Sequence, residues 1–165
     1  MKKIIFILLI SLIFITACTK PNIYELSIED LIPNDKIGNL KISNIEFPIG
    51  SYNEEAIKYS IKEARGITYI DLDNNNKDVS EAIILECINN DICYNSAVTD
   101  LTSKTTKSTY INIKSKRILR IDGSYGSYTN IRYVWSDGNF LFIIKSEYDG
   151  VNKAITKNII SKYTI

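Results

Sequence analysis

The sequence predicts an α+β fold that is mainly β, with one short helix packed on an antiparallel sheet of hairpins. Seven strand-like runs follow residue 66, and Asp-Gly pairs, which favour tight turns, lie beside several of them. Only one earlier segment spaces its apolar residues as a helix does. The chain has 165 residues and is 45% apolar, which is enough for one core and one domain.

The first 17 residues have the pattern of a secretory signal. Lys2 and Lys3 form a positive start, and residues 4–15 form an apolar run interrupted only by Ser11. This run of 12 residues is too short to span about 30 Å of hydrocarbon, and it has the length of a signal core. The sequence therefore predicts export.

The apolar run ends in Ile-Thr-Ala-Cys at residues 15–18, which resembles the lipobox of bacterial lipoproteins. The resemblance implies that the Cys18 thiol receives a diacylglyceryl group, that the signal is cut before Cys18, and that the new amino terminus is acylated. Several acyl chains on one residue anchor a protein stably. An uncleaved N-terminal anchor with an incidental cysteine is the alternative.

The expected domain organisation follows from this cleavage site. Residues 1–17 are the signal peptide, residues 18–35 a lipidated tether, and residues 36–165 a single β-rich domain. The expected location is the cell envelope, with the protein anchored through the Cys18 lipid and facing the periplasm or the cell surface. Thr19, in place of an aspartate after the cysteine, favours the outer membrane if the organism has two membranes.

Composition excludes several classes of site. The absence of histidine excludes Ser-His-Asp and Cys-His catalytic groups and His-ligated zinc.

The charges are divided unevenly along the chain. Residues 22–100 contain 15 acidic and 6 basic residues, whereas residues 101–165 contain 4 acidic and 11 basic residues. This division indicates either an anionic partner or two halves that pair in one sheet. Without the two signal lysines the net charge falls from +1 to −1, which gives no strong field for nucleic acid.

In an exported chain, Cys87 and Cys93 are expected to form a disulfide. They enclose a polar loop between two strand-like runs, so we expect the bond to close a hairpin with the usual Cα separation of about 4.4–6.8 Å. A metal-thiolate pair is the alternative, and it has no further cysteine or histidine to complete it. Closing so small a loop is expected to stabilise the fold by about 2 kcal/mol.

Three elements are expected before residue 66. Alternating apolar residues at 24–28 predict a first strand. Residues 40–47 predict a strand with a bulge, because the apolar alternation shifts phase after Ile42. Residues 53–64 predict the one helix, since their apolar residues have helical spacing, the first turn is acidic and a glycine follows.

After residue 66 the pattern is that of strands and tight turns. Asp-Gly at residues 137–138 predicts the clearest hairpin, with a type I′ turn, and Asp-Gly at 122–123 and 149–150 predicts two more turns. Residues 151–165 fit a helix or a strand. The predicted strands are residues 67–72, 80–87, 93–101, 108–113, 116–121, 129–136 and 139–147.

One segment has the chemistry of a cation site. Residues 71–78 alternate oxygen-bearing side chains, a spacing that suits Ca²⁺, which takes about 6–8 oxygen ligands. The EF-hand pattern fails, because position 12 is Ala82 and the flanks are strand-like. A turn that satisfies its own backbone without metal is the alternative. The candidate ligands of a structural Ca²⁺ are Asp71, Asp73, Asn75, the backbone carbonyl of Lys77, Asp78 and Glu81.

This turn, followed by an apolar run, resembles the DLNGDGKDEA turn of FG-GAP and VCBS-like β domains. It is still more similar to a group of small exported bacterial proteins in which a short helix precedes the turn and a two-cysteine hairpin follows. The resemblance covers residues 53–150 and implies a blade-like sheet whose turn can hold calcium. Asn74 and Asn76 replace the two glycines of the pattern, and two residues are inserted before Glu81.

A tyrosine-bearing loop is the other candidate binding segment. Tyrosine offers a large contact area at a small entropic cost, so exposed tyrosines beside an arginine suit a glycan or a protein. A loop that leads into a core-facing strand is the alternative. The candidate residues are Tyr125, Tyr128, Arg132 and Tyr133.

The sequence thus predicts a lipid-anchored envelope protein that acts by binding, with no enzymatic activity and no catalytic residues. Its expected partners are the membrane, through the Cys18 lipid, and an envelope protein rather than nucleic acid. One alternative is an inhibitor or immunity lipoprotein against a peptidoglycan hydrolase. The other is a structural or assembly lipoprotein of the envelope.

Overall fold

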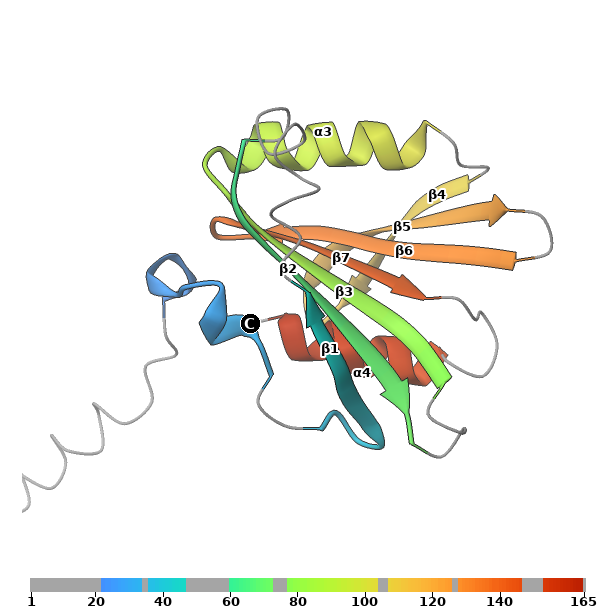
Figure 1. The fold of residues 1–165 in the computed structure, drawn as a ribbon. Helices are drawn as coiled ribbons and strands as arrows, with labels where there is room; N and C mark the ends of the chain where they lie inside the picture. The colour runs from blue at the N-terminus through green and yellow to red at the C-terminus, as the bar shows by residue number, and fades with distance from the viewer. Residues whose placement is uncertain are drawn as a thin grey trace, which may run out of the picture.

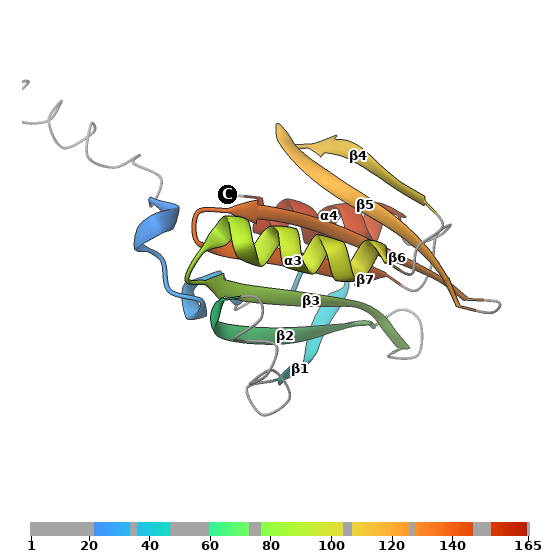
Figure 2. The same ribbon diagram turned by 90° about the horizontal axis from the view of Figure 1, so that it is seen from above.

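The computed structural model of the protein describes residues 22–33, 36–46, 60–72, 77–103, 107–125, 128–146 and 153–164. They form one antiparallel sheet of seven strands, with helix α3 against one face and helix α4 against the other (Figures 1 and 2). The predicted β-rich, antiparallel α+β class is confirmed. The elements are the 3₁₀ turns η2 (Ile23–Glu25) and η3 (Glu29–Leu31), the strands β1 (Leu40–Glu46), β2 (Ile61–Asp71), β3 (Lys77–Cys87), β4 (Lys107–Ile113), β5 (Lys116–Tyr125), β6 (Tyr128–Asp137) and β7 (Phe140–Ser146), and the helices α3 (Asn90–Thr102) and α4 (Lys153–Tyr163).

Two meanders meet at the centre of the sheet, whose strand order is β1-β2-β3-β7-β6-β5-β4. β3 pairs with β7, which places Ile83 opposite Ile143. β7 is covered on both faces, and residues 140–144 are therefore apolar and buried without interruption. We expected one helix on a blade-like sheet, whereas the described residues place a helix on each face.

Each face of the sheet has its own hydrophobic core. On the α4 face, the ring of Phe142 stacks on that of Trp135 with centroids 5.0 Å apart, and lies 5.9 Å from that of Tyr163 on α4. On the α3 face, the helix buries two small side chains, Cys93 and Ala97. They pack on a sheet surface formed by Ile83, Leu85, Leu119, Val134, Leu141 and Ile143.

The turns and the bulge are partly as predicted. The register of β1 shifts between Ile42 and Asn44, which confirms the bulge. The β6–β7 hairpin is also present, but its loop is Gly138-Asn139, one residue later than the Asp-Gly pair. Only Gly138 of this loop has a positive φ, 56°, which is typical of a type II′ turn. The type I′ turn occurs in the β4–β5 loop at residues 114–115, where both φ values are positive.

The helix predicted at residues 53–64 is wrong over its last turn, because residues 61–64 begin strand β2. Residues 53–59 lie outside the described residues. The register of β2 shifts between Ile61 and Glu63, so Ile61 and Ala64 pack in the same α3-face core although they are three residues apart. A bulge in a strand thus imitates the apolar spacing of a helix.

The strand predicted at residues 93–101 is also wrong, since this segment is helix α3. Asn89 caps the helix by accepting a hydrogen bond on its Oδ1 from the backbone N–H of Ile92, at 3.1 Å. Cys93 and Ala97, four residues apart, face the sheet. The valine and threonines of the segment favour strands, and they conceal this helical spacing.

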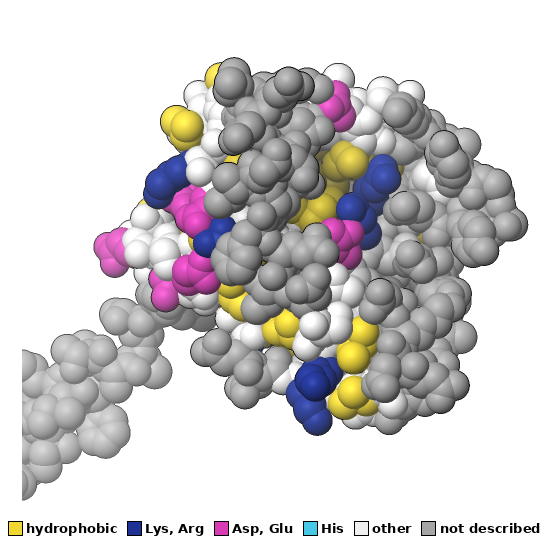
Figure 3. Space-filling model, in the orientation of Figure 1, with side chains coloured by type: hydrophobic (Ala, Val, Ile, Leu, Met, Phe, Trp, Pro, Cys, Tyr) yellow, Lys and Arg dark blue, Asp and Glu magenta, His cyan; other side chains and the backbone are white. Residues whose placement is uncertain are grey.

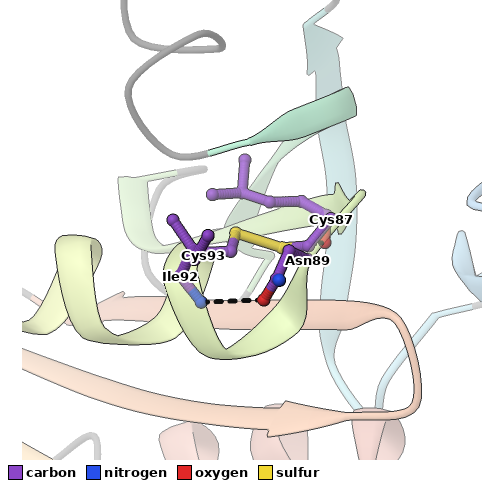
Figure 4. Close-up of a disulfide and its surroundings, with 5 residues drawn as sticks. Cys87, Asn89, Ile92 and Cys93 are labelled. Atoms are coloured by element: carbon purple, nitrogen blue, oxygen red, sulfur yellow. Dashed lines mark hydrogen bonds between the residues drawn. A yellow bond between two sulfur atoms is a disulfide. The ribbon is translucent and has the colours of Figure 1, made fainter.

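Cys87 and Cys93 form the disulfide that was predicted, with their Cα atoms 6.1 Å apart (Figure 4). The expected hairpin is wrong, because the bond joins the end of β3 to the first turn of α3. It spans the corner that Asn89 caps. The disulfide therefore holds the start of the helix against the strand from which the chain has just turned.

The turn predicted at Asp122-Gly123 lies inside β5, where the two residues pair with Ile131 and Asn130 of β6. The β5–β6 hairpin instead turns beyond Tyr125. Both strands continue past the Asp-Gly pair because each finds a partner there, which outweighs the local turn preference. The turn predicted at residues 149–150 lies outside the described residues.

Part of the predicted tether belongs to the folded domain. Ile28 and Leu31 are buried in the α4-face core. Ile23 also packs on the domain, at the β6–β7 turn. Its Cγ2 is so close to Gly138 that a Cβ added there would lie 2.9 Å from it. The strand predicted at residues 24–28 is wrong, because the segment contains the end of η2 and the residues that lead to η3. Leu26 and Ile28 reach the α4-face core from this irregular stretch.

Helix α4 occupies the tail that fits a helix or a strand by sequence, and a pair of tyrosines joins it to the sheet. The Tyr163 hydroxyl lies 2.5 Å from the Tyr69 hydroxyl of β2, and both side chains are buried. Burial raises the pKa of Tyr69 to about 12. Burial and the neighbouring Tyr69 also raise the pKa of Tyr163. On the other face, burial raises the pKa of Tyr94 in α3 to about 12.

The free energy of unfolding should therefore fall as the pH rises from about 10 to about 12, where unfolded tyrosines ionise and folded ones keep their protons. Below the ordinary pKa of 10.0 both states are neutral, so the contribution is complete. Urea unfolding across this range compares the wild type with Tyr69→Phe/Tyr163→Phe. This variant removes both hydroxyls together, so it keeps its stability at neutral pH and loses less in alkali. An equal loss of unfolding free energy in alkali for the wild type and the variant would show that the tyrosine pair does not cause the pH dependence.

Candidate functional site

The sheet has two ends, and different connections lie at each (Figures 1 and 2). The tether end comprises η2, the β3–α3 corner, and the β4–β5 and β6–β7 turns; Ile23 of η2 follows the predicted anchor Cys18 by five residues. The far end is where β2 passes to β3 and β5 passes to β6. β2 and β3 have 11 residues each, so about 35 Å separates the two ends at about 3.3 Å per residue.

The far end brings together the two segments that the sequence singled out for binding. β2 ends with Asp71 opposite Lys77, and β5 ends with Tyr125 opposite Tyr128. β7 lies between these hairpins and ends at Ser146, while β3 and β6 both extend beyond that level. At about 4.8 Å per strand, β3 and β6 are about 10 Å apart at the level of Ser146.

Of the candidate calcium ligands, the structure describes the backbone on either side of the turn. Asp71 and Lys77 pair in the β2–β3 ladder, and Asp78 pairs with Ile70. Asp73 and Asn75 lie outside the described residues. Within the ranges given above, no three Asp, Glu or Cys side chains are grouped as a metal site requires.

Glu81, the remaining candidate, is placed away from the turn. It lies four residues along β3 from Lys77, a distance of about 13 Å at about 3.3 Å per residue. Its Oε2 accepts a hydrogen bond from Nζ of Lys145 on β7, at 2.7 Å. The inclusion of Glu81 among the ligands is therefore wrong, because the strand carries its carboxylate to a partner on β7.

Glu81 belongs to a charged row across the α3 face. Lys145 lies opposite Glu81 on one side and opposite Arg132 on the other. Arg132 Nε is buried and has no hydrogen-bond partner in the part of the chain that the structure describes. No local pattern predicts Lys145 as a member of this row, since its place depends on the pairing of β3 with β7.

The prediction that Tyr133 belongs to a binding loop is wrong. Its side chain is only 6% exposed and lies in the α4-face core. Successive residues of a strand point to opposite faces, so Arg132 and Tyr133 are separated by the sheet. The backbones of Tyr125 and Tyr128 pair at the end of the hairpin, and their side chains are not among those described.

An ion cluster fixes the N-terminal segment to the sheet. The Arg65 side chain of β2 is 7% exposed and contacts the carboxylates of Glu29 in η3 and Glu63. Its Nε donates to Oε1 of Glu29 at 2.9 Å, and its Nη1 donates to the carbonyl of Ala64 at 2.9 Å. Charge-assisted bonds of this kind are strong, so the segment that follows Cys18 is held firmly.

An aromatic and cationic group lies at the β4 edge of the α3 face. The guanidinium of Arg117 lies 3.8 Å from the ring centroid of Tyr110, which is 50% exposed. Tyr94 of α3 lies close to Tyr110, and its pKa is raised first by burial and then by this neighbour. No sequence pattern predicts this group, because its members come from α3, β4 and β5 and meet only in the fold.

The acidic and basic halves of the sequence meet at the β3–β7 pairing, where Glu81 binds Lys145. On the face in Figure 3, described side chains of opposite charge lie next to each other in several places. This favours two halves that pair in one sheet over a surface of a single sign. Among the described residues, the other ion pairs each join residues of one half: Lys62–Glu86, Arg65–Glu29, Arg65–Glu63, Lys116–Asp137 and Arg120–Asp122.

In the described ranges, neither helix has the length and apolar character needed to cross a membrane.

The chain matches no protein-family model. It also has no match among curated protein sequences.

Proposed function

We propose that the protein is a lipid-anchored, non-enzymatic binding protein of the cell envelope, and that its far end contacts the partner. The arrangement of the sheet carries this proposal. The chain enters from Cys18 at the tether end, and both candidate binding hairpins extend to the opposite end, about 35 Å away. A protein anchored in this way presents its hairpins to the envelope space.

The residues of the far end suit recognition of a protein. Tyr125 and Tyr128 flank the end of the β5–β6 hairpin, and tyrosine adds contact area at a small entropic cost. Further along β6, Arg132 lies opposite Lys145 of β7, so two cationic residues are next to each other on this part of the sheet. A loop that carries carbonyl or carboxylate acceptors is the partner chemistry that fits these groups.

Cys18 tests the anchor. We expect the wild-type protein in the membrane fraction, with an N-terminal peptide that begins at Cys18 and has the mass of its acyl chains. Cys18→Ala should lose this mass, because the thiol that accepts the diacylglyceryl group is gone. A mature chain that begins at Met1 and lacks lipid would contradict the proposal.

Site-specific photo-crosslinking in intact cells tests the binding end. A photoreactive phenylalanine at Tyr128 should form protein adducts, whereas one at Thr99, exposed on α3, should not. Mass spectrometry of the adduct separates the two versions of the function. A peptidoglycan hydrolase would indicate an inhibitor, and an envelope assembly protein would indicate a structural role. Adducts only at Thr99 would refute the far end as the contact surface.

We also propose a structural Ca²⁺ in the β2–β3 turn, held by Asp71, Asp73, Asn75, the carbonyl of Lys77 and Asp78. At about 100 times its Kd, Ca²⁺ should stabilise the fold by about 2.7 kcal/mol and raise the Tm by about 5–10 °C relative to EDTA. Asp73→Ala should abolish the shift. Glu81→Ala is the matched control and should keep it, because Glu81 binds Lys145 instead. An unchanged Tm in the wild type would disprove the site.

A further inference from the structure

Exposed apolar side chains gather at the tether end. Of the five large hydrophobic side chains exposed among the described residues, three lie there: Tyr24 in η2 is 65% exposed, Ile88 at the β3–α3 corner is 75% exposed, and Ile92 in the first turn of α3 is 47% exposed. An isolated exposed isoleucine is ordinary. Two isoleucines and a tyrosine at the end where the chain enters the domain form a surface that requires an explanation.

The fold holds these side chains on either side of the β6–β7 turn. On one side, Ile23, the neighbour of Tyr24, packs against Gly138. On the other side, the backbone N–H of Cys87 donates to the carbonyl of Asn139 at 2.7 Å, directly before Ile88. The surface is therefore a fixed part of the tether end.

The disulfide maintains the apolar corner. Ile88 and Ile92 both lie within the loop that Cys87 and Cys93 close (Figure 4). The cross-link thus fixes the corner that carries both exposed isoleucines, and an apolar medium next to this corner would remove their side chains from water.

We infer that Tyr24, Ile88 and Ile92 rest on the lipid bilayer to which Cys18 is anchored. This inference depends on the proposed lipid anchor. Ile23 follows Cys18 by only five positions, so the tether spans at most about 18 Å, and the tether end must stay close to the lipid surface. Isoleucine enters the boundary between headgroups and acyl chains, and tyrosine is favoured at the headgroup level.

Charge contributes little to this contact. Glu25 and Asp91 lie beside the apolar side chains, on η2 and in the first turn of α3. Lys114, in the β4–β5 turn, uses its Nζ to donate to the carbonyl of Ser161 at 2.6 Å. With both signs present at this end, apolar contact orients the domain, and added salt should leave the orientation unchanged.

Photo-crosslinking of the lipidated, full-length mature protein in phosphatidylethanolamine–phosphatidylglycerol vesicles tests the inference. A photoreactive phenylalanine at Ile88 should form lipid adducts, at a yield about tenfold above that at Leu72, because the interface holds side chains within about 5–10 Å of the acyl chains. Leu72 is the matched control, since it is a 37%-exposed apolar residue at the far end. Mass spectrometry of Cys18 on the same sample measures the anchor separately.

A second variant makes the test independent of the probe position. With the probe at Tyr24, the lipid adducts should fall about tenfold in Ile88→Glu/Ile92→Glu, because charged side chains leave the apolar boundary. Leu72→Glu should leave them unchanged. Equal lipid adducts at Ile88 and Leu72, or protein adducts only at Ile88, would overturn the inference while Cys18 carries lipid. A Cys18 without lipid would overturn the proposed function and, with it, this orientation.

Discussion

Phe142→Ala should lower the free energy of unfolding by about 3–5 kcal/mol, a large part of the stability of a domain of this size. Phe142 is fully buried at the centre of the α4-face core. It stacks on Trp135 and contacts Tyr163 of α4, so its removal leaves a cavity between the sheet and the helix. Urea unfolding of the purified mature domain measures the loss.

Phe142→Leu is the matched control, because leucine keeps most of the buried volume. It should cost less than about 1.5 kcal/mol. A loss below about 1 kcal/mol for the alanine variant would show that α4 does not pack on this ring. A similar loss in both variants would show that the ring stacking, rather than the filled volume, holds the helix.

Arg65→Met should destabilise the protein by about 2–3 kcal/mol and loosen the N-terminal segment. The loss is smaller than the 3–5 kcal/mol of a fully buried pair, since Glu29 is 57% exposed and water can solvate it once the arginine is gone. Methionine keeps the stem volume, so the change reports the ion cluster. Hydrogen exchange at residues 27–31 should increase together with the loss of stability.

Arg120→Met provides the comparison for an ion pair at the surface. Arg120 Nε lies 2.7 Å from Oδ1 of Asp122 on the same strand, and both side chains are partly exposed. Such pairs contribute about 0–1 kcal/mol, so this variant should remain close to the wild type. Equal effects of the two substitutions would mean that Arg65 does not fasten the N-terminal segment.

Local patterns predict the strands of this fold better than its helices. Alternation and turn residues indicate β4 to β7, and the phase shift after Ile42 indicates the bulge in β1. The bulge in β2 has the opposite effect, because it places Ile61 and Ala64 at a spacing that helices share. A short window of sequence cannot distinguish these two causes, since only the pairing of β2 with its neighbours decides between them.

The candidate site shows the same division between local and distant information. The sequence that resembles a lipobox at residues 15–18 and the cysteine pair are local, so their patterns are visible in the chain. The exclusion of Glu81 from the turn depends on Lys145, which is 64 residues away. The placement of both hairpins at the same end of the sheet also follows from the β3–β7 pairing. Contacts between residues so far apart in the sequence leave no periodic pattern from which they could be predicted.

The pairing of β3 with β7 has a consequence for the order in which the chain folds on the proposed export route. Cys87 and Cys93 are six positions apart, so on that route they can meet as soon as this stretch has crossed the membrane. Ile83 and Ile143 are 60 positions apart, and the entropic cost of closing a loop rises with its length. We therefore expect oxidation to precede closure of the sheet, with the far end assembled only after β7 has emerged.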